Sequence, residues 1–522
     1  MRNILIMRCT VFLCTIVLLG LSHGLHTAGR QRPIVQTDAG ELRGVYKISA
    51  FKGRRYNINH FLGIRYAKPP VGELRFMKPE PFVYDEPHEA TEFGSACPQV
   101  DMMGLGVESH DEDCLFLNMF LPTDFPDTDS GHAVIIFIHG GGFAYGSSSL
   151  INGDLLAAAG NVIVVTFNYR LGLFGFLNPG DDTFPENAGL WDQRLAIQWV
   201  KDNIEKFAGD PNRITLMGES SGSASVILHG MYPPNEGLFH NLVSFSGTPF
   251  MPPGYFKDNA MAAQYLADMV SCYPIGDMFK TCMQAQNITK FMDALKSGVN
   301  NMKVWRRLNF SPTIDGDYIK ANPMSVLLQS KQEHIDSVEF LQSLNLVTGV
   351  NNAEGGLWIM NMVEDIDRLA IYSADMAAEF IPNALPFVVG FDGNIPRVLI
   401  DMVLAEYTDW NNLTDSRLKY VKLMGDLNFN VPLMELGMVH SDSTSSKTWV
   451  FKFDALLPEH VLPTPNWLKT ANHGDFLAPL FGFSKNFTFG RYKDIEDYTP
   501  SKWEQRLSRR IITHVSTFAK TG

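Results

Sequence analysis

The chain has 522 residues, of which 45% are hydrophobic and 19% are charged. This is ordinary globular composition with ample material for a large core, and it excludes a disordered or fibrous protein. The formal net charge of −13 argues against a role in binding nucleic acid. No repeat, low-complexity tract or flexible linker divides the sequence, so we treat residues 25–522 as a single domain.

The N-terminus has the pattern of a secretory signal peptide. Arg2 and Arg8 form a short basic start, an apolar run covers Cys9 to Leu21, and small residues precede a cleavage point after Gly24. The apolar run is too short for a membrane anchor, and no later stretch is long enough to span a membrane. We therefore expect residues 1–24 to be removed, which changes the net charge from −13 to −15. A secreted protein is predicted, without a C-terminal signal for retention in the endoplasmic reticulum.

Four cysteines remain after signal removal: Cys97, Cys114, Cys272 and Cys282. An even number in an exported chain predicts two disulfides. Three pairings are possible, and Cys97 with Cys114 and Cys272 with Cys282 are favoured because short loops close most easily. Neither zinc-ligand spacing nor a Cys-x-x-Cys pair is present, so no metal or thiol chemistry and no cofactor is expected.

Asn-x-Ser/Thr sequons occur at Asn287, Asn309, Asn412 and Asn486. In an exported protein these are expected glycosylation sites on the surface. The sequon at Asn309 is the weakest of the four, because a proline follows its serine directly.

The middle of the chain alternates strand-like and helix-like segments. Apolar runs at Ala133 to Ile138 and Val162 to Phe167 precede a helix with one apolar face, from Ala196 to Phe207, and then a strand at Ile214 to Met217. This order predicts a parallel crossover and an α/β fold with helices on both faces of the sheet. Later strands are expected at Leu242 to Ser246, Leu346 to Val350 and Trp449 to Phe453. The stretches 250–340 and 355–445 are interpreted as long insertions over the sheet.

A Gly-x-Ser-x-Gly motif, Gly218-Glu219-Ser220-Ser221-Gly222, follows the strand that ends at Met217. A helix-compatible stretch begins directly after it. This context predicts a nucleophile elbow, in which Ser220 occupies a strained turn and flanking glycines clear the neighbouring chain. The bare motif is weak evidence, and the strand, turn and helix around it raise its value.

A second glycine-rich segment, His139-Gly140-Gly141-Gly142, stands at the end of the Ala133 to Ile138 strand. Successive glycines can bring backbone amides close to a bound carbonyl and stabilise a tetrahedral oxyanion. Another donor would be the amide of Ser221, at the positive end of the helix after the elbow. A glycine-rich turn without function is the alternative, but both motifs in one chain make a strong combination.

A serine nucleophile needs a base, and the base needs a carboxylate to orient it. In this fold the chain order is nucleophile, acid and then histidine. Glu354 follows the Leu346 to Val350 strand and is modestly preferred to Asp392, which follows another apolar run. His473 lies in a loop after the last predicted strand and is the favoured base.

The chain resembles type-B carboxylesterases of the carboxylesterase and cholinesterase family from about residue 33 to its end. The resemblance rests on ordered blocks: FLGIRYAKPPVGELRF at 61–76, EDCLFLN at 112–118, HGGGF at 139–143, NYRLGLFGFL at 168–177, NAGLWDQRLAIQWV at 187–200 and DPNRITLMGESSG at 210–222. It implies the α/β-hydrolase fold, the same disulfide pairing and hydrolysis of small-molecule carboxylic esters.

By this resemblance Ser220 is the nucleophile, Glu354 the acid and His473 the base, and the amides of Gly141, Gly142 and Ser221 form the oxyanion hole. Ser246 matches a position that supports the triad through hydrogen bonding, although a structural serine is an equal alternative. The sequence differs from the usual family pattern at two positions: Ser221 stands where the family usually has alanine, and Phe476 stands where an acidic residue is common. Relatives usually continue beyond the point of Gly522, so a C-terminal truncation stays open.

Two rival interpretations use the same fold. One is a noncatalytic adhesion protein like the neuroligins, in which the catalytic serine is lost, whereas Ser220 is present here. The other is a lipase or cholinesterase. The resemblance places the cholinesterase tryptophan that holds the quaternary ammonium in the first disulfide loop, but the loop from Cys97 to Cys114 contains no aromatic residue. Tyr145 or Trp358 is a possible substitute, and the sequence does not specify acyl group, alcohol or oligomeric state.

Overall fold

The structure is a computed structural model that describes residues 32–522. The gaps in this range are 52–53, 101–106, 108–109, 252–258, 274–277, 300–307, 309, 330–333, 358–395, 409–416, 444 and 484–498. The predicted signal peptide therefore lies outside the described residues.

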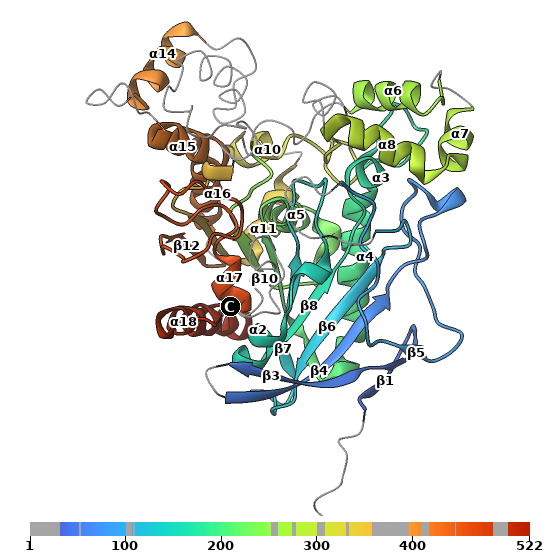
Figure 1. Ribbon diagram of the computed structural model, residues 1–522, viewed down its shortest axis with the longest axis vertical. Coiled ribbons are helices and arrows are strands. Elements are labelled where there is room, and N and C mark those ends of the chain that lie inside the picture. The colour runs from blue at the N-terminus through green and yellow to red at the C-terminus, as the bar shows by residue number, and fades with distance from the viewer. Residues whose placement is uncertain are drawn as a thin grey trace, which may run out of the picture.

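A nine-stranded sheet forms the centre of the molecule (Figure 1). Its order is β12-β11-β10-β9-β7-β8-β6-β4-β3, and the six strands from β12 to β8 are parallel, whereas β6, β4 and β3 continue the sheet in antiparallel pairs. The strands are β3 (Val45–Phe51), β4 (Arg54–Arg65), β6 (Phe116–Pro122), β7 (His132–Ile138), β8 (Ile163–Phe167), β9 (Gly209–Glu219), β10 (Asn241–Phe245), β11 (Asn345–Asn351) and β12 (Thr448–Phe453). The predicted α/β fold with a mostly parallel sheet is confirmed.

The central strands are apolar on both faces because helices cover both faces. Successive side chains of a strand point to opposite sides, so each strand contributes to two cores. In β7, for example, Val134 and Ile136 belong to one hydrophobic core, and Ile135 and Phe137 belong to the other. The alternation fixes the register, because a shift by one residue would exchange the two cores.

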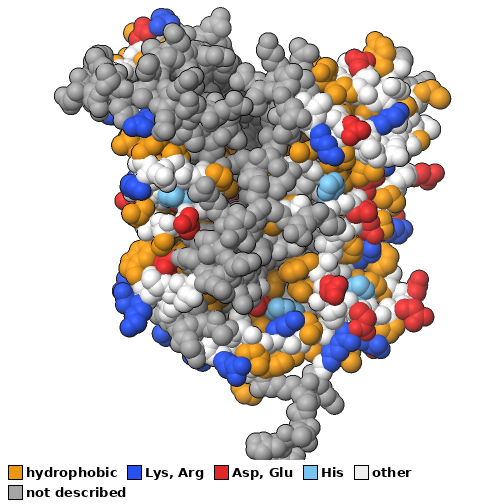
Figure 2. All heavy atoms as spheres, in the orientation of Figure 1, with side chains coloured by type: hydrophobic (Ala, Val, Ile, Leu, Met, Phe, Trp, Pro, Cys, Tyr) orange, Lys and Arg blue, Asp and Glu red, His pale blue; other side chains and the backbone are white. Residues whose placement is uncertain are grey.

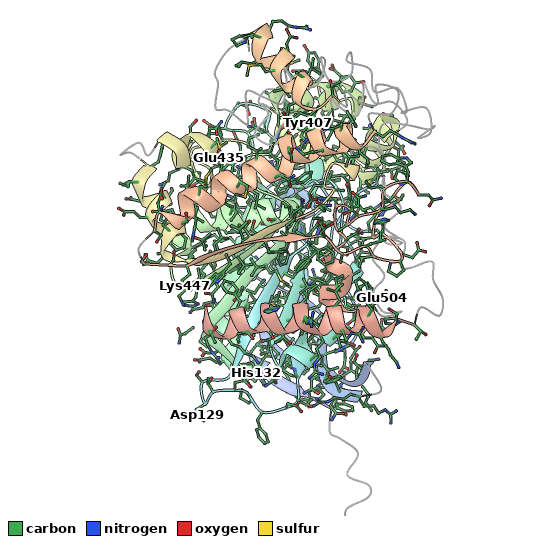
Figure 3. The ribbon with its side chains drawn as sticks, turned by 90° about the vertical axis from the view of Figure 1, so that its left-hand side faces the viewer. Asp129, His132, Tyr407, Glu435, Lys447 and Glu504 are labelled. Carbon is green, nitrogen blue, oxygen red and sulfur yellow. A yellow bond between two sulfur atoms is a disulfide. The ribbon has the colours of Figure 1, made fainter. Side chains whose placement is uncertain are left out.

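Different helices complete the two cores. Helices α4 (Ala188–Asn203) and α5 (Ser221–Gly230) contribute to the first. Helices α2 (Asp154–Gly160), α17 (Leu477–Phe481) and α18 (Lys502–Thr521) contribute to the second, and α18 packs against both α17 and α2. Figure 3 shows α18, which carries Glu504, and α16 (Val431–Ser441), which carries Glu435, on the face turned toward the viewer.

The described parts of the predicted insertions contain several helices joined by loops. The first contains α6 (Ala260–Met269), α7 (Phe279–Ala285), α8 (Ile288–Val299), α10 (Pro323–Gln329) and α11 (Ile335–Ser343). The second contains α14 (Arg397–Glu406), α15 (Arg417–Gly425), the π-helical turn η7 (Asp426–Asn430) and α16. In Figure 1, α6, α7 and α8 lie at one upper end of the molecule and α14 and α15 lie at the other.

The remaining elements are short. A small sheet contains β1 (Ile34–Thr37), β2 (Gly40–Arg43) and β5 (His88–Glu89). Helix α3 (Gly172–Phe176) follows β8, and short 3-10 turns are η1 (Gly72–Leu74), η2 (Ser148–Leu150), η3 (Ile204–Phe207) and η4 (Pro233–Asn235).

Acidic and basic side chains are interspersed over the described parts of the face in Figure 2. The described residues contain no helix that is long and apolar enough to cross a membrane.

Candidate active site

Ser220 lies at a sharp turn between β9 and α5. Its backbone angles are φ 57° and ψ −124°, which is a conformation that non-glycine residues rarely adopt. A Cβ on Gly218 would lie 2.3 Å from the carbonyl oxygen of Gly222, and a Cβ on Gly222 would lie 2.1 Å from the carbonyl oxygen of Ile138. Both flanking positions therefore require glycine, and the turn has the geometry of a nucleophile elbow.

The glycine-rich loop after β7 lies directly against this turn. A Cβ on Gly140 would be 2.9 Å from Cβ of Ser220, so only a glycine permits this approach. Gly141 and Gly142 have φ angles of 113° and 61°. The loop then folds back on itself, because the amides of Ala144 and Tyr145 donate to the carbonyl of Gly141 at 3.0 and 3.1 Å.

Three backbone amides are predicted oxyanion donors, those of Gly141, Gly142 and Ser221. Within the described part of the chain, the amides of Gly141 and Gly142 donate no backbone hydrogen bond. Ser221 is the first residue of α5, where helix amides lack partners and the helix dipole is positive. The hydroxyl of Ser221 is buried and finds no hydrogen-bond partner among the described residues.

Glu354 and His473 meet although they are far apart in sequence. Glu354 comes three residues after β11, and His473 lies between β12 and α17. Because β9, β11 and β12 are parallel, the residues after these strands gather at one edge of the sheet. Nδ1 of His473 lies 2.5 Å from Oε2 of Glu354, and both side chains are buried.

The other oxygen of Glu354 is also held. The hydroxyl of Ser246 donates to Oε1 at 2.5 Å, and the backbone amide of Asn351 donates to the same atom at 2.5 Å. The side-chain amide of Asn351 adds contacts of 3.1 Å to both Glu354 and Ser246. These bonds fix the carboxylate so that Oε2 is directed at the imidazole. The supporting position suggested for Ser246 is thus matched by a direct hydrogen bond.

Glu219 is a second buried carboxylate at His473, and it was not predicted there from the sequence. Its Oε1 lies 3.2 Å from Nε2 of His473, on the side of the ring opposite Glu354. Burial, together with the charge of Glu354, raises the pKa of Glu219 to about 7, although His473 opposes the shift. The sequence feature that could have indicated this contact is the position of Glu219 directly before Ser220 in the elbow motif.

The pKa of His473 is raised above its usual value. Burial lowers it, but the charges of Glu219 and Glu354 and the hydrogen bond to Glu354 outweigh burial. The ring of Phe429, in the π-helical turn η7, packs on the imidazole with the ring centroids 4.8 Å apart. The imidazole is therefore hydrogen-bonded to Glu354 at Nδ1, lies beside the Glu219 carboxylate at Nε2, and is packed against Phe429.

The hydroxyl of Ser220 makes no hydrogen bond to His473 or to any other described residue. Nε2 of His473 instead faces Glu219, the residue that directly precedes Ser220. In enzymes without bound substrate, hydrogen bonds between nucleophile and base are often long or poorly aligned. The structure thus places His473 against Glu354 and against Glu219 of the elbow motif, without a hydrogen bond between Ser220 and His473.

Both predicted disulfides are present, Cys97 to Cys114 and Cys272 to Cys282. Asn287 is exposed, whereas Asn309, Asn412 and Asn486 lie outside the described residues, as do Asp392 and Trp358. Tyr145 is half-buried at the end of the glycine loop. No group of metal-ligating side chains occurs among the residues that the structure describes.

The strand order and the elbow define an α/β-hydrolase. The chain belongs to the carboxylesterase family, because the model of that family matches residues 31–522. The predicted family resemblance is therefore confirmed.

Relatives of the chain include both hydrolases and neuroligins. Pyrethroid hydrolase Ces2e of Rattus norvegicus is 28% identical over 94% of this chain and 82% of its own length. Acetylcholinesterase of Bungarus fasciatus is 30% identical over 94% of this chain and 78% of its own length. Neuroligin-2 of Mus musculus is 30% identical over 96% of this chain, which spans 62% of that protein. The relatives named as hydrolases support an ester hydrolase in general. Because neuroligins match at similar identity, the comparisons alone do not distinguish a catalytic from a noncatalytic protein.

Proposed function

We propose that the protein is a serine hydrolase that cleaves carboxylic esters through an acyl-enzyme on Ser220. His473 is the general base and Glu354 is the acid that orients it. The observation that carries this proposal is the buried pair of His473 and Glu354 beside a serine elbow that requires glycine on both sides. An adhesion protein on the same fold needs none of these groups.

In the first half-reaction, Oγ of Ser220 attacks the ester carbonyl carbon while Nε2 of His473 accepts the hydroxyl proton. The amides of Gly141, Gly142 and Ser221 stabilise the negative charge that develops on the carbonyl oxygen. The tetrahedral intermediate collapses, the bond to the alcohol breaks, and His473 returns the proton to the departing alkoxide oxygen. The acyl group then remains on Ser220.

In the second half-reaction, water takes the place of the alcohol. His473 accepts a proton from water as the oxygen attacks the acyl carbon, and it returns the proton to Ser220 when the carboxylic acid leaves. The carboxylates of Glu354 and Glu219 both stabilise the transient imidazolium. No cofactor enters these steps, and small-molecule esters are the proposed substrates.

We further propose that residues 25–522 form one secreted domain after removal of residues 1–24. Asn287, Asn309, Asn412 and Asn486 are its proposed glycosylation sites. N-terminal sequencing of the secreted protein and glycosidase treatment with mass spectrometry test these two points.

The central test compares Ser220→Ala with Ser225→Ala. Ser225 is also buried in α5, and its hydroxyl finds no hydrogen-bond partner among the described residues. Ser220→Ala should abolish ester hydrolysis with little change in the melting temperature, whereas Ser225→Ala should retain activity. A fluorophosphonate probe should label the wild type and Ser225→Ala on the peptide that contains Ser220. A label on another peptide, or a folded wild type that neither hydrolyses nor labels, would refute the assignment and favour a noncatalytic protein.

A further inference from the structure

Gln99 connects the first disulfide loop to the glycine loop of the active site. Its side-chain Nε2 donates to the carbonyl of Gly146 at 2.8 Å, and its Oε1 accepts from the amide of Gly146 at 2.7 Å. Nε2 also donates to the carbonyl of Cys97 at 3.0 Å. Gln99 is buried, so all three bonds are formed away from water. Its amide therefore replaces the backbone partner that Gly146 lacks in the loop.

Gly146 is the point at which the glycine loop returns to its own beginning. Its φ angle is 120°, and a Cβ there would lie 2.5 Å from Nδ1 of His139 and 2.6 Å from the carbonyl oxygen of Gly140. The backbone of Gly146 thus packs on the residues that immediately precede Gly141. A displacement of Gly146 would move Gly140, and with it the adjoining amides of Gly141 and Gly142, which are the proposed oxyanion donors.

The other end of this connection is covalently anchored. Gln99 lies two residues after Cys97, which is bonded to Cys114, and a bridge pairs Ala96 with His110. Cys97 and Cys114 are both buried in the first hydrophobic core. Gln99 therefore connects a restrained segment to a glycine-rich loop. Glycine has the greatest backbone freedom of all residues, so this loop depends on such contacts to hold its conformation.

We propose that Gln99 is a positioning residue of the oxyanion hole: it clamps Gly146 and thereby holds the amides of Gly141 and Gly142 where the oxyanion forms. This inference rests on the proposed function. It requires no contact between Gln99 and substrate. The clamp acts on the transition state more than on substrate binding, because the oxyanion develops only after attack by the serine.

The test uses Gln99→Leu, which removes both bonds to Gly146, and Gln99→Glu, which keeps the shape but places a carboxylate oxygen against the carbonyl of Gly146. Removal of one oxyanion donor costs about 10² to 10³ in kcat. A loosened loop with its donors retained should cost less, about 10-fold to 10²-fold in kcat, with KM within about twofold. Affinity for a trifluoromethyl ketone, which forms a tetrahedral oxyanion adduct, should fall by a factor similar to the loss in kcat/KM.

Gln286→Leu is the matched control. Gln286 lies beside the second disulfide, and its side-chain amide also donates to a backbone carbonyl, that of Val270 at 2.9 Å. Its other side-chain contacts among the described residues are with the two cysteines of that disulfide, away from the glycine loop. Its removal should leave kcat and the affinity for the ketone unchanged.

Hydrogen exchange supplies a readout that does not depend on activity. The amides of Ala144, Tyr145 and Gly146 are bonded within the loop or to Gln99, and they should exchange faster in both Gln99 variants than in the wild type or Gln286→Leu. Faster exchange together with the selective loss of kcat supports the clamp. Unchanged exchange, or faster exchange with unchanged kcat, overturns it. An inactive wild type would refute the proposed function instead, and unchanged exchange would then still refute the clamp.

Discussion

Replacement of Glu219 by glutamine is the most direct test of the electrostatics at the site. Glutamine keeps the size of the side chain and removes the charge that Glu219 carries above its pKa of about 7, which faces Nε2 of His473 at 3.2 Å. At this separation, Coulomb's law with an effective dielectric constant of about 20 gives a gross attraction of about 5 kcal/mol. Burial disfavours the charged form of His473 and so offsets part of this attraction. An opposite charge this close typically changes the pKa of a side chain by about 1 to 3.

The sign of the effect follows from the role of the base. On the proposed function only neutral His473 accepts the serine proton, so kcat/KM should increase with pH through the pKa of His473. Both carboxylates favour the imidazolium, and the wild-type limb should therefore lie above the ordinary histidine value of about 6.5. Glu219→Gln should move this limb to lower pH, by about one pH unit or more. Because the imidazolium also forms in the transition state, the plateau of kcat/KM should fall about tenfold for each pH unit by which the limb moves.

The assay is the pH dependence of kcat/KM for a neutral ester between pH 5 and 9. Glu504→Gln provides a control at another buried glutamate, which lies in the capping box of α18, and it should leave the limb in place. An unchanged limb, or one at higher pH, in Glu219→Gln would refute the electrostatic reasoning. Activity that is independent of pH between 5 and 8 in the wild type would refute a histidine base altogether.

Three further predictions concern the acid, the elbow and the substrate. Glu354→Gln should lower kcat by about 10⁴ by leaving His473 wrongly oriented, whereas Asp392→Asn should do much less; the reverse order in steady-state kinetics would mean that the acid is wrongly assigned. Gly222→Ala should lower the melting temperature and abolish fluorophosphonate labelling, because the added Cβ would lie 2.1 Å from a backbone oxygen. Gly437→Ala is the control and should be tolerated, because its Cβ would lie 3.2 Å from a methyl group of Val450. Equal melting temperatures of the two variants would contradict the steric argument. Acetylcholine should not be preferred to its uncharged tert-butyl isostere, because the sequence from Cys97 to Cys114 contains no Phe, Tyr or Trp to hold a quaternary ammonium. A tenfold preference in kcat/KM for acetylcholine, about 1.4 kcal/mol, would contradict this.

The parallel half of the sheet could be predicted from the sequence because its strands are continuous apolar runs. The strand predicted at Ala133 to Ile138 is confirmed as β7, which is one residue longer at its start. The strand predicted at Leu346 to Val350 is confirmed as β11, which is one residue longer at each end. The strand expected at Ile214 to Met217 is longer than predicted, since β9 begins at Gly209. Glycine and proline at the start of β9 are typical of a helix end, but Gly209 already pairs with His132 of β7.

The antiparallel strands were less apparent. Strand β4 contains polar side chains at Asn57, Asn59 and His60, so its pattern is not that of a buried run. Its bulge between Phe61 and Ile64 interrupts the alternation further. Strand order and antiparallel pairing depend on contacts distant in sequence, which local periodicity does not encode.

The site shows the same division. Ser220 and the glycine loop have local motifs, and they were predictable from strand, turn and helix signals. Glu354 and His473 each have no local signature, and chain order with the family resemblance was needed to select them. The roles proposed for Glu219 and Gln99 were not predicted, because their contacts are with residues remote in sequence: His473 for Glu219, and the backbone of Gly146 for Gln99.

The assembly of the site from distant strands also affects how folding can be followed. The bond between Glu354 and His473 spans 119 residues, and the bond between Ser246 and Glu354 spans 108. Contacts of such long range are slow to form, because the loop entropy is lost before the contacts stabilise the chain. On the proposed function, Ser220 acquires its reactivity only when β9, β11 and β12 have all joined the sheet. A covalent serine probe would then count completely folded molecules, and partly folded chains with abundant secondary structure would remain unlabelled.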